Sequence, residues 1–314
     1  MNRFQRSNPV FVRAINYSVG KSVPITEIGE LSGSNDLLDR LSKRGIEVAS
    51  IIDDDRDSLS DTLNRCFSET NCEQSEITDV IFTTGSSSWS AHDEDTIRRT
   101  IQNSGVENTS FLSVNGNQCA NVSSALKIAR MMALEPEKKD ILVLSHDAVS
   151  LGEQRLVPPD STVNGDGSAS CIISNSDGDL ELLTSSVYSS ASLFRLQGNR
   201  ASCSSARYLS AHLDAINNVV NQVCDELKLS FSDFTKIIPP NLSLESSSLI
   251  ENIYDLESSM LYSENISRLG HVQSCDPLIN LADYCASTTQ KCGEYILLLC
   301  SGLYSWGATV LRRT

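Results

Sequence analysis

The spacing of apolar residues changes along the chain, and each spacing predicts a different kind of element. β-Branched and aromatic residues alternate with polar ones over 9–18, which predicts a strand. The run 79–85 (DVIFTTG) is compact, apolar and closed by glycine, as in a strand buried on both faces of a parallel sheet. Helical spacing appears over 58–72 and 207–228, and a more polar helix is expected over 93–103.

Further strands are expected at 110–114 and 140–145 (DILVLS), on either side of one more helix. In NGDGSASCIIS (164–174) two glycines precede a strand, and the run 179–190 is expected to pair with that strand as its neighbour. The glycines permit a tight turn or a close approach of two backbone segments. The acidic stretch 20–60 has no regular spacing. Strands that alternate with helices in this way predict a layered α/β fold with right-handed crossovers.

Cys119 stands where a helix begins. The turn-prone run 115–118 (NGNQ) precedes it, and apolar residues follow at helical spacing from Val122 to Met132. A thiol at a helix N-terminus faces unpaired backbone N–H groups and the positive end of the helix dipole, which favour thiolate over thiol. Cys119 is therefore a candidate nucleophile, and a small buried residue is the alternative interpretation.

The second half of the chain repeats the order of elements in the first. Val80 matches Lys236 and Cys119 matches Cys275, both at an offset of 156 residues, and DILVLS matches YILLLC at an offset of 155. Three matched elements in the same order at a nearly constant offset indicate a duplicated α/β unit.

The duplication divides the chain into an N-terminal half, 1–165, and a C-terminal half, 166–314. We expect two sheets stacked through a pseudo-two-fold axis, with the two equivalent helices buried between them. The N-termini of both central helices would then meet near one site. Cys119 marks the first helix, and Gly270-His271 marks the approach to the second.

His271 is the histidine best placed to act with the cysteine. A thiolate needs a general base or an imidazolium partner, and the proton affinity of histidine suits that role near neutral pH. Asp276, followed by Pro277, has the pattern of a helix N-cap, so we expect a structural role for it. Loop or surface roles are expected for the other three histidines, His92, His146 and His212.

Composition limits the compartment and the partners. With 25 basic and 40 acidic residues the net charge is −15, which argues against a nucleic-acid or anionic-membrane partner. No apolar run approaches the roughly 18 residues of a membrane helix, and the N-terminus lacks a secretory-signal pattern, so we expect a cytoplasmic protein. The ten cysteines form no CxxC pair and no grouping with histidine, so no metal site and mostly reduced core cysteines are expected.

Together these motifs resemble the β-ketoacyl-acyl carrier protein synthase III group of the thiolase fold. The resemblance covers nearly the whole chain and rests on DVIFTTG, NGNQCANVSSAL, DILVLSHDA, NGDGSASCII, IIPPN, RLGHVQSCDPLINL and YILLLCSGLYSWGATVLRR. It implies a five-layer α-β-α-β-α architecture, a homo- or heterodimer, no permanently bound cofactor, and transfer of an acyl group from coenzyme A or a carrier protein onto Cys119. It also implies an oxyanion hole made by the backbone N–H groups of Cys119 and of Leu303, which replaces a family glycine and must therefore avoid positive φ.

The sequence departs from the condensing enzymes of this group at two positions. A family histidine is replaced at Pro240 in the motif PPN, and the family asparagine after the glycine is replaced by His271. In the family those two groups hold the thioester carbonyl of a malonyl unit during decarboxylation. Losing one such donor costs on the order of 2.7 to 4 kcal/mol. Condensation should be impaired unless Asn241 or water serves as an auxiliary donor, whereas acylation of Cys119 is retained.

The resemblance therefore favours an acyltransferase, similar to relatives with the same Gly-His substitution that esterify or amidate small molecules. Cys119 would be loaded from an acyl thioester, and His271 would activate a hydroxyl or amine of a small-molecule acceptor in specialised metabolism. The family tryptophan and arginine that grip the coenzyme A adenine are missing near residue 35, where LSGSND stands, and the helix after PPN is acidic. An acidic carrier protein would be repelled by that helix, so both donor types remain open.

Three alternatives remain beside this interpretation. The first is decarboxylative carbon–carbon condensation, and the second is a non-catalytic subunit of a heterodimeric synthase. The third is a thiolase-like reaction in which Cys300 or Cys275 acts as the base.

Overall fold

The computed structural model describes residues 8–53, 55–68, 74–86, 91–107, 109–135, 140–150, 153–157, 161–194, 206–287 and 291–314. Within this part of the chain, nine strands form one hydrogen-bonded sheet in the order β11-β12-β13-β10-β1-β9-β6-β4-β5. Its strands are β1 (Phe11–Val19), β4 (Ile77–Thr83), β5 (Ser110–Val114), β6 (Asp140–Asp147), β9 (Gly167–Ser174), β10 (Leu180–Ser189), β11 (Phe234–Ile238), β12 (Tyr295–Ser301) and β13 (Ser305–Arg313). Two small ladders pair β2 (Lys21–Pro24) with β3 (Val48–Ile51), and β7 (Leu156–Val157) with β8 (Thr162–Val163).

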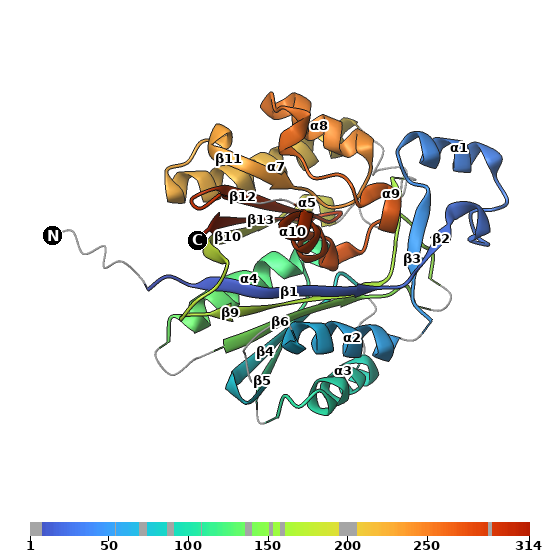
Figure 1. The fold of residues 1–314 in the computed structure, drawn as a ribbon. Coiled ribbons are helices and arrows are strands. Elements are labelled where there is room, and N and C mark those ends of the chain that lie inside the picture. The colour runs from blue at the N-terminus through green and yellow to red at the C-terminus, as the bar shows by residue number, and fades with distance from the viewer. Residues whose placement is uncertain are drawn as a thin grey trace.

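The sheet is divided into two stacked layers that join at the start of β1. That strand pairs with β9 along most of its length but with β10 only at Phe11 and Val12. Figure 1 shows α4 and α10 between the two layers, α2 and α3 outside the β1-β9-β6-β4-β5 layer, and α7 and α8 outside the other. The expected five-layer α-β-α-β-α architecture is confirmed. The helices are α1 (Asn35–Lys43), α2 (Asp55–Ser68), α3 (Ala91–Asn103), α4 (Asn121–Ala133), α5 (Ala191–Phe194), α7 (Ala206–Leu227), α8 (Leu244–Tyr254), α9 (Ile266–Leu269) and α10 (Asp276–Ser287).

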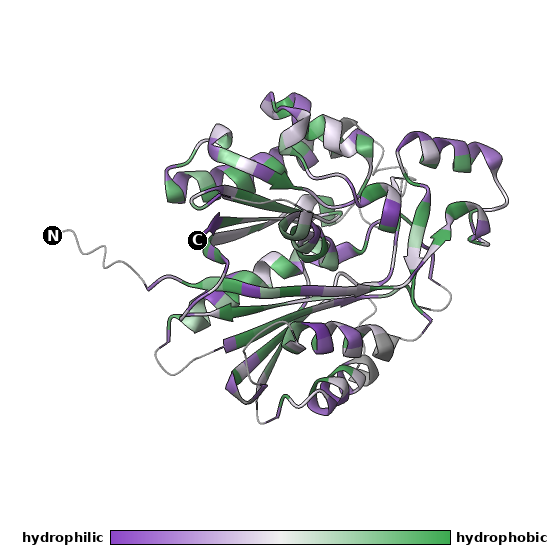
Figure 2. Ribbon diagram, in the orientation of Figure 1, coloured by the Kyte–Doolittle hydropathy of each residue, from purple (hydrophilic) through white to green (hydrophobic). Residues whose placement is uncertain are grey.

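The two central helices are buried because small and apolar residues occupy most of their surface. Figure 2 shows hydrophobic residues concentrated in the strands, while hydrophilic residues gather on outer helices such as α1 and α3. Each central helix is preceded by one 3₁₀ turn, Gln118–Ala120 before α4 and Gln273–Cys275 before α10. The first residues of these turns have φ values of 49° (Gln118) and 47° (Gln273). The duplicated geometry therefore extends to the unusual backbone conformation at both helix starts.

The division into halves at 1–165 and 166–314 stays a prediction. β9 begins at Gly167, after that boundary, yet its partners β1 and β6 belong to the first layer. The sheet pairing would move the boundary to the turn after Ser174.

Two expectations about secondary structure were wrong. The strand at 179–190 does not pair with β9, because β1 and β6 already occupy both edges of β9; β10 pairs instead with β13. The stretch 20–60 is also more regular than its spacing suggested, since it contains β2, α1 and β3. Helix α1 has Leu41 as its buried residue and is capped by the Ser34 side chain, which accepts a hydrogen bond from the Leu37 N–H.

Candidate active site

Cys119 lies on the 3₁₀ turn that opens α4, two residues before the first α-helical residue. It is 8% exposed. The turn is held by Asn121, whose side-chain oxygen accepts from the Asn117 N–H at 2.8 Å and whose amide donates to the Thr84 carbonyl at 2.6 Å. The cysteine therefore stands at a rigid helix start, as the sequence pattern predicted.

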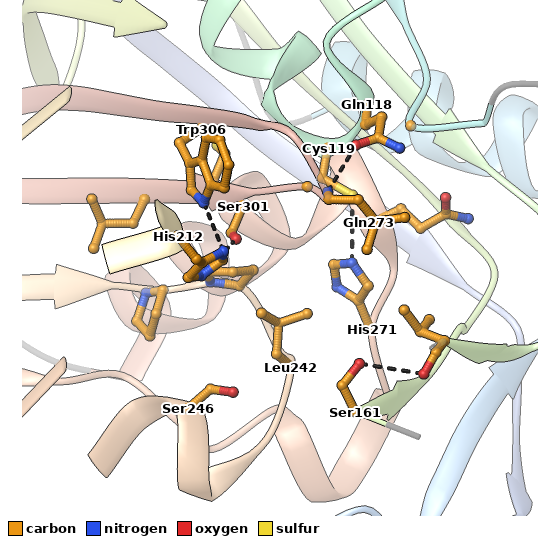
Figure 3. Close-up of a pocket in the computed structure, with 18 of the residues that line it drawn as sticks. Gln118, Cys119, Ser161, His212, Leu242, Ser246, His271, Gln273, Ser301 and Trp306 are labelled. Carbon is orange, nitrogen blue, oxygen red and sulfur yellow. Dashed lines mark hydrogen bonds between the residues drawn. The ribbon is translucent and has the colours of Figure 1, made fainter. Parts of the chain in front are cut away.

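His271 contacts Cys119 although 152 residues separate them. Its Nε2 lies 3.5 Å from the Cys119 Sγ, and Figure 3 shows the ring edge facing the sulfur. The histidine is buried, at 3% exposure. The two residues that sequence analysis selected are thus neighbours in the fold.

The backbone of His271 is held by a segment from the N-terminal half. The His271 N–H donates to the Val163 carbonyl, and the Gly165 N–H donates to the His271 carbonyl, both at 2.9 Å. Glycine is required on both sides of this contact. A Cβ on Gly165 would lie 2.5 Å from the Leu269 carbonyl oxygen, and Gly270 has φ of 70° with the Val163 carbonyl oxygen 2.8 Å from its Cβ position. Gly165, which precedes β9, therefore serves a close backbone approach, one of the two roles expected for the glycines of this motif.

The segment that holds His271 is itself anchored by a buried ion pair. Arg155 donates from Nη1 and Nη2 to the two carboxylate oxygens of Asp166, each at 2.7 Å. Asp166 also accepts from the N–H groups of Val149 at 2.9 Å and Ile52 at 3.1 Å. Because this carboxylate is almost fully buried and fully bonded, it fixes the turn on which the histidine rests.

The expectation that Asp276 caps a helix is wrong. Asp276 is the first residue of α10, with helical φ and ψ, and does not cap the helix from outside. The Nδ1–H of His271 donates to its Oδ2 at 2.6 Å, and the backbone N–H groups of Val272 and Asn241 donate to its two oxygens at 2.8 and 2.7 Å. Cys119, His271 and Asp276 thus form a continuous chain of contacts. The spacing of five residues between a loop histidine and the first residue of a helix was the available signal.

The surroundings of His271 raise its pKa to about 10. Burial alone would lower the pKa, but the negative charges of Asp276 and of the Cys119 sulfur, together with hydrogen bonds to both, outweigh burial. The imidazolium form is therefore favoured while both negative partners are present.

Asn241 does not line the cavity that contains Cys119. Its side-chain N–H groups donate to Asp276 Oδ1 at 3.1 Å and to Asn280 Oδ1 at 3.3 Å, and its Oδ1 accepts from the Asn280 amide at 2.9 Å. Asn241 therefore supports the carboxylate behind His271, whereas the sequence analysis considered it as a donor to substrate.

A cavity of about 770 Å³ leads to Cys119 and His271. Its walls include Leu303 of the terminal loop, Pro240 after β11, a mostly apolar face of α7 and a mixed polar and apolar face of α8. The φ of Leu303 is not positive, so a leucine can adopt this backbone conformation without strain. A buried thiol with a histidine beside it and a largely apolar channel can take an extended acyl group.

His212 also lines this cavity, contrary to the surface role expected for it. The indole N–H of Trp306 donates to its Nδ1 at 3.1 Å, and its Nε2 is 3.5 Å from the Ser301 hydroxyl (Figure 3). Burial lowers the pKa of His212 to about 4, so it is neutral at physiological pH. His146 is likewise buried, on β6, with Nδ1 2.8 Å from the Ser168 hydroxyl. His92 belongs to α3, and its side chain lies outside the described residues.

Solved structures with the same architecture are known. ChlB3, described as an acyltransferase, superimposes with a TM-score of 0.82 at 15% identity, covering 97% of this chain and 98% of that one. The chain has the thiolase fold. A 3-oxoacyl-[acyl-carrier-protein] synthase III from Aquifex aeolicus VF5 gives a TM-score of 0.80 at 16% identity, covering 96% and 99% of the two chains. Cerulenin-bound OleA from Xanthomonas campestris gives 0.80 at 14% identity, covering 98% and 99%. Neither a family model nor a curated protein matches the sequence.

Two other cysteines are buried in the core cluster that contains residues of the two central helices. Cys300 is 3.2 Å from the Ser123 hydroxyl, and burial raises its pKa to about 12. Burial also raises the pKa of Cys275 well above its ordinary value. Both are therefore protonated thiols at neutral pH, which argues against either as a base. Eight cysteines in the described ranges are free, and Cys72 and Cys203 lie outside them.

Arg44 and Glu245 both line the cavity and form an ion pair. The Arg44 guanidinium contacts the Glu245 carboxylate of α8 at 3.0 Å, so its charge is offset locally. Across the described part of the thiolase fold, no three metal-ligating side chains are grouped to hold a metal ion. No helix in the same residues is both long and apolar enough to span a bilayer.

Proposed function

We propose that this protein is an acyltransferase that forms an acyl-thioester on Cys119 and passes the acyl group to a small-molecule hydroxyl or amine. The observation that supports this proposal is the connected series Cys119, His271 and Asp276, in which the first two residues line the cavity. The same three roles, nucleophile, base and orienting carboxylate, recur in acyl-transfer enzymes on unrelated folds.

In the first step the Cys119 sulfur attacks the carbonyl carbon of an acyl thioester. A tetrahedral intermediate forms, with its negative oxygen on the backbone N–H groups of Cys119 and Leu303. The carbon–sulfur bond to the donor then breaks. The departing thiolate takes the proton held by His271, whose raised pKa makes it an imidazolium before reaction.

In the second step the chemistry of His271 changes. The acylated sulfur carries no negative charge, so one of the charges that raise the His271 pKa is gone, while burial still lowers it. The neutral imidazole can then take the proton of an acceptor hydroxyl or amine as that group attacks the acyl carbon. Asp276 holds the Nδ1–H throughout, which keeps Nε2 turned toward the sulfur.

Decarboxylative condensation is the second candidate, since a synthase III and OleA share the fold. Two local features oppose it. Pro240 lines the cavity where the condensing enzymes carry a histidine, and a proline offers no N–H donor. The Asn241 amide is turned to Asp276 and Asn280. The second donor that would hold a malonyl carbonyl is therefore missing among the described side chains at this position.

The proposal also includes the acyl donor, the oligomeric state and the cellular compartment. The donor is an acyl-coenzyme A or an acyl-carrier protein used as substrate, with no resident cofactor. We propose a dimer in the cytoplasm that serves specialised metabolism. A chain acting only as a scaffold subunit would have no need of the Cys119, His271 and Asp276 arrangement, so we favour a catalytic chain.

Intact-mass measurement tests the proposal. The full chain is incubated with acetyl-, hexanoyl- and benzoyl-coenzyme A, and with the matching N-acetylcysteamine thioesters. We expect one added acyl mass, released by hydroxylamine, absent from Cys119→Ala and retained in Cys292→Ala, which alters an exposed cysteine. Adding simple alcohols and amines should then shorten the lifetime of the acyl-enzyme. Absence of Cys119 acylation with every donor would overturn the proposal.

A further inference from the structure

The side chain of Gln118, immediately before Cys119, lies against the terminal loop. Its Oε1 accepts a hydrogen bond from the Leu303 N–H at 2.8 Å. A Cβ placed on Gly302 would lie 2.7 Å from this oxygen and 3.0 Å from the Gln118 Cβ, so the glutamine packs directly on the loop backbone. Figure 3 shows Gln118 beside Cys119, with a dashed line that marks the hydrogen bond of its amide oxygen.

The backbone at Gln118 is in the left-handed region, with φ of 49°. This conformation is uncommon for residues other than glycine and persists only where the surrounding structure determines it. The Leu303 N–H is a donor, so the atom that faces it must be the amide oxygen. An amide oxygen and a thioester carbonyl oxygen approach an N–H with the same preferred geometry.

We propose that Gln118 caps the Leu303 N–H in the empty enzyme and that the carbonyl of the acyl donor must displace this cap. The inference rests on the proposed function, in which the Leu303 N–H stabilises the tetrahedral oxyanion. The Leu303 N–H is part-buried beside the cavity and is paired with the Gln118 oxygen, and one N–H cannot serve two carbonyl oxygens at full strength. Gln118 satisfies the N–H between turnovers and leaves it when substrate arrives, so one hydrogen bond is exchanged for another.

This exchange makes Gln118 a specificity-determining residue. A donor gains the Leu303 N–H only by replacing the Gln118 oxygen, so the rate of acylation depends on how well its carbonyl accepts a hydrogen bond in that position. Groups that reach Cys119 without presenting a carbonyl gain nothing from the N–H and do not need to move Gln118.

Two substitutions test the cap by changing only the acceptor. Gln118→Met keeps a similar volume but removes the oxygen, and Gln118→Glu places a charged acceptor on the N–H. With hexanoyl-coenzyme A, we expect Gln118→Met to acylate about fivefold faster, the factor for one net neutral hydrogen bond, and Gln118→Glu at least as much slower. Alkylation of Cys119 by iodoethane, which has no carbonyl and uses no oxyanion hole, should proceed in Gln118→Met at the wild-type rate.

The outcomes separate the inference from the proposed function. If wild type acquires acyl groups but Gln118→Met is slower or unchanged, the cap is wrong, and a slower rate indicates that Gln118 itself assists the oxyanion. If wild type is never acylated, both proposals are wrong. A crystal structure of the wild-type acyl-enzyme gives a test that needs no variant: Gln118 should have left Leu303, and a retained 2.8 Å contact would overturn the inference.

Discussion

The Nδ1–H of His271 donates to Asp276 Oδ2 at 2.6 Å, from a loop to the first residue of the helix that follows. Asp276 also accepts hydrogen bonds from the backbone N–H groups of Val272 and Asn241, which fix the orientation of its carboxylate. The orientation of the imidazole therefore depends on the start of α10, and the position of its backbone depends on Val163 and Gly165.

Asp276→Asn should remove most of the acyl-transfer activity while leaving the chain folded. An amide can donate to Nδ1 and so stabilise the wrong tautomer, an effect that costs about 10⁴-fold in kcat in a serine protease triad. We expect a loss of about 10²- to 10⁴-fold in kcat/KM for acyl transfer. Steady-state kinetics across pH, with circular dichroism as the folding control, would check it. A variant with wild-type activity at every pH would show that Asp276 only supports the fold.

The stability of the protein should depend on the ionisation of His271. The folded-state pKa is raised from 6.5 to about 10, so the charged form is favoured by the fold. This contribution is fully present below about pH 6.5 and is lost as pH rises through about 10. The difference in unfolding free energy between wild type and His271→Gln, from urea titrations, should therefore shrink between these two pH values. A difference that grows with pH would contradict the assigned charge state.

Gly165→Ala should displace His271 without changing any residue that lines the cavity. The added Cβ would lie 2.5 Å from the Leu269 carbonyl oxygen, so the loop that carries His271 must shift. A shift of about 1 Å can cost roughly 10²-fold in rate. Gly33→Ala is the matched control, because its Cβ meets nothing within 4 Å. Acylation rates and melting temperatures of both variants would check this, and equal rates would contradict it.

Wild-type protein should release little carbon dioxide from malonyl-coenzyme A. The paired Pro240→His and His271→Asn substitutions restore the side chains of the condensing enzymes, and one oxyanion donor is worth about 10²- to 10³-fold. We expect the double variant to release carbon dioxide at least tenfold faster than wild type, as measured with carboxyl-labelled malonyl donor. Robust release by wild type that is lost in His271→Asn would favour condensation over transfer.

The sequence was sufficient for the features that follow from local pattern and duplication. Helix starts, buried strands and the constant offset between halves placed Cys119 and His271 at the two central helix N-termini, and those residues are in contact. The contact of Asp276 with His271 was not predicted, because an aspartate before proline has the same local pattern whether it caps a helix or accepts from a side chain. His212 was missed because its position on α7 gave no sign that the helix borders the cavity.

The direction in which a side chain points was the other feature that the sequence could not predict. Asn241 and Gln118 are each one residue from a position of interest, and only the three-dimensional packing determines what their amides contact. Asn241 turns to Asp276, whereas Gln118 reaches the Leu303 N–H 185 residues away. Contacts of that range depend on how the two layers meet, which no local pattern specifies.

The hydrogen bonds that hold the His271 backbone to Val163 and Gly165 have a consequence for how the protein folds during synthesis. Cys119 is synthesised well before His271, and Val163 and Gly165 lie between them in the sequence. The thiol and the imidazole are therefore brought together only when the loop that carries His271 has docked on Val163 and Gly165. A nascent chain that has not yet reached residue 271 contains Cys119 without this neighbour.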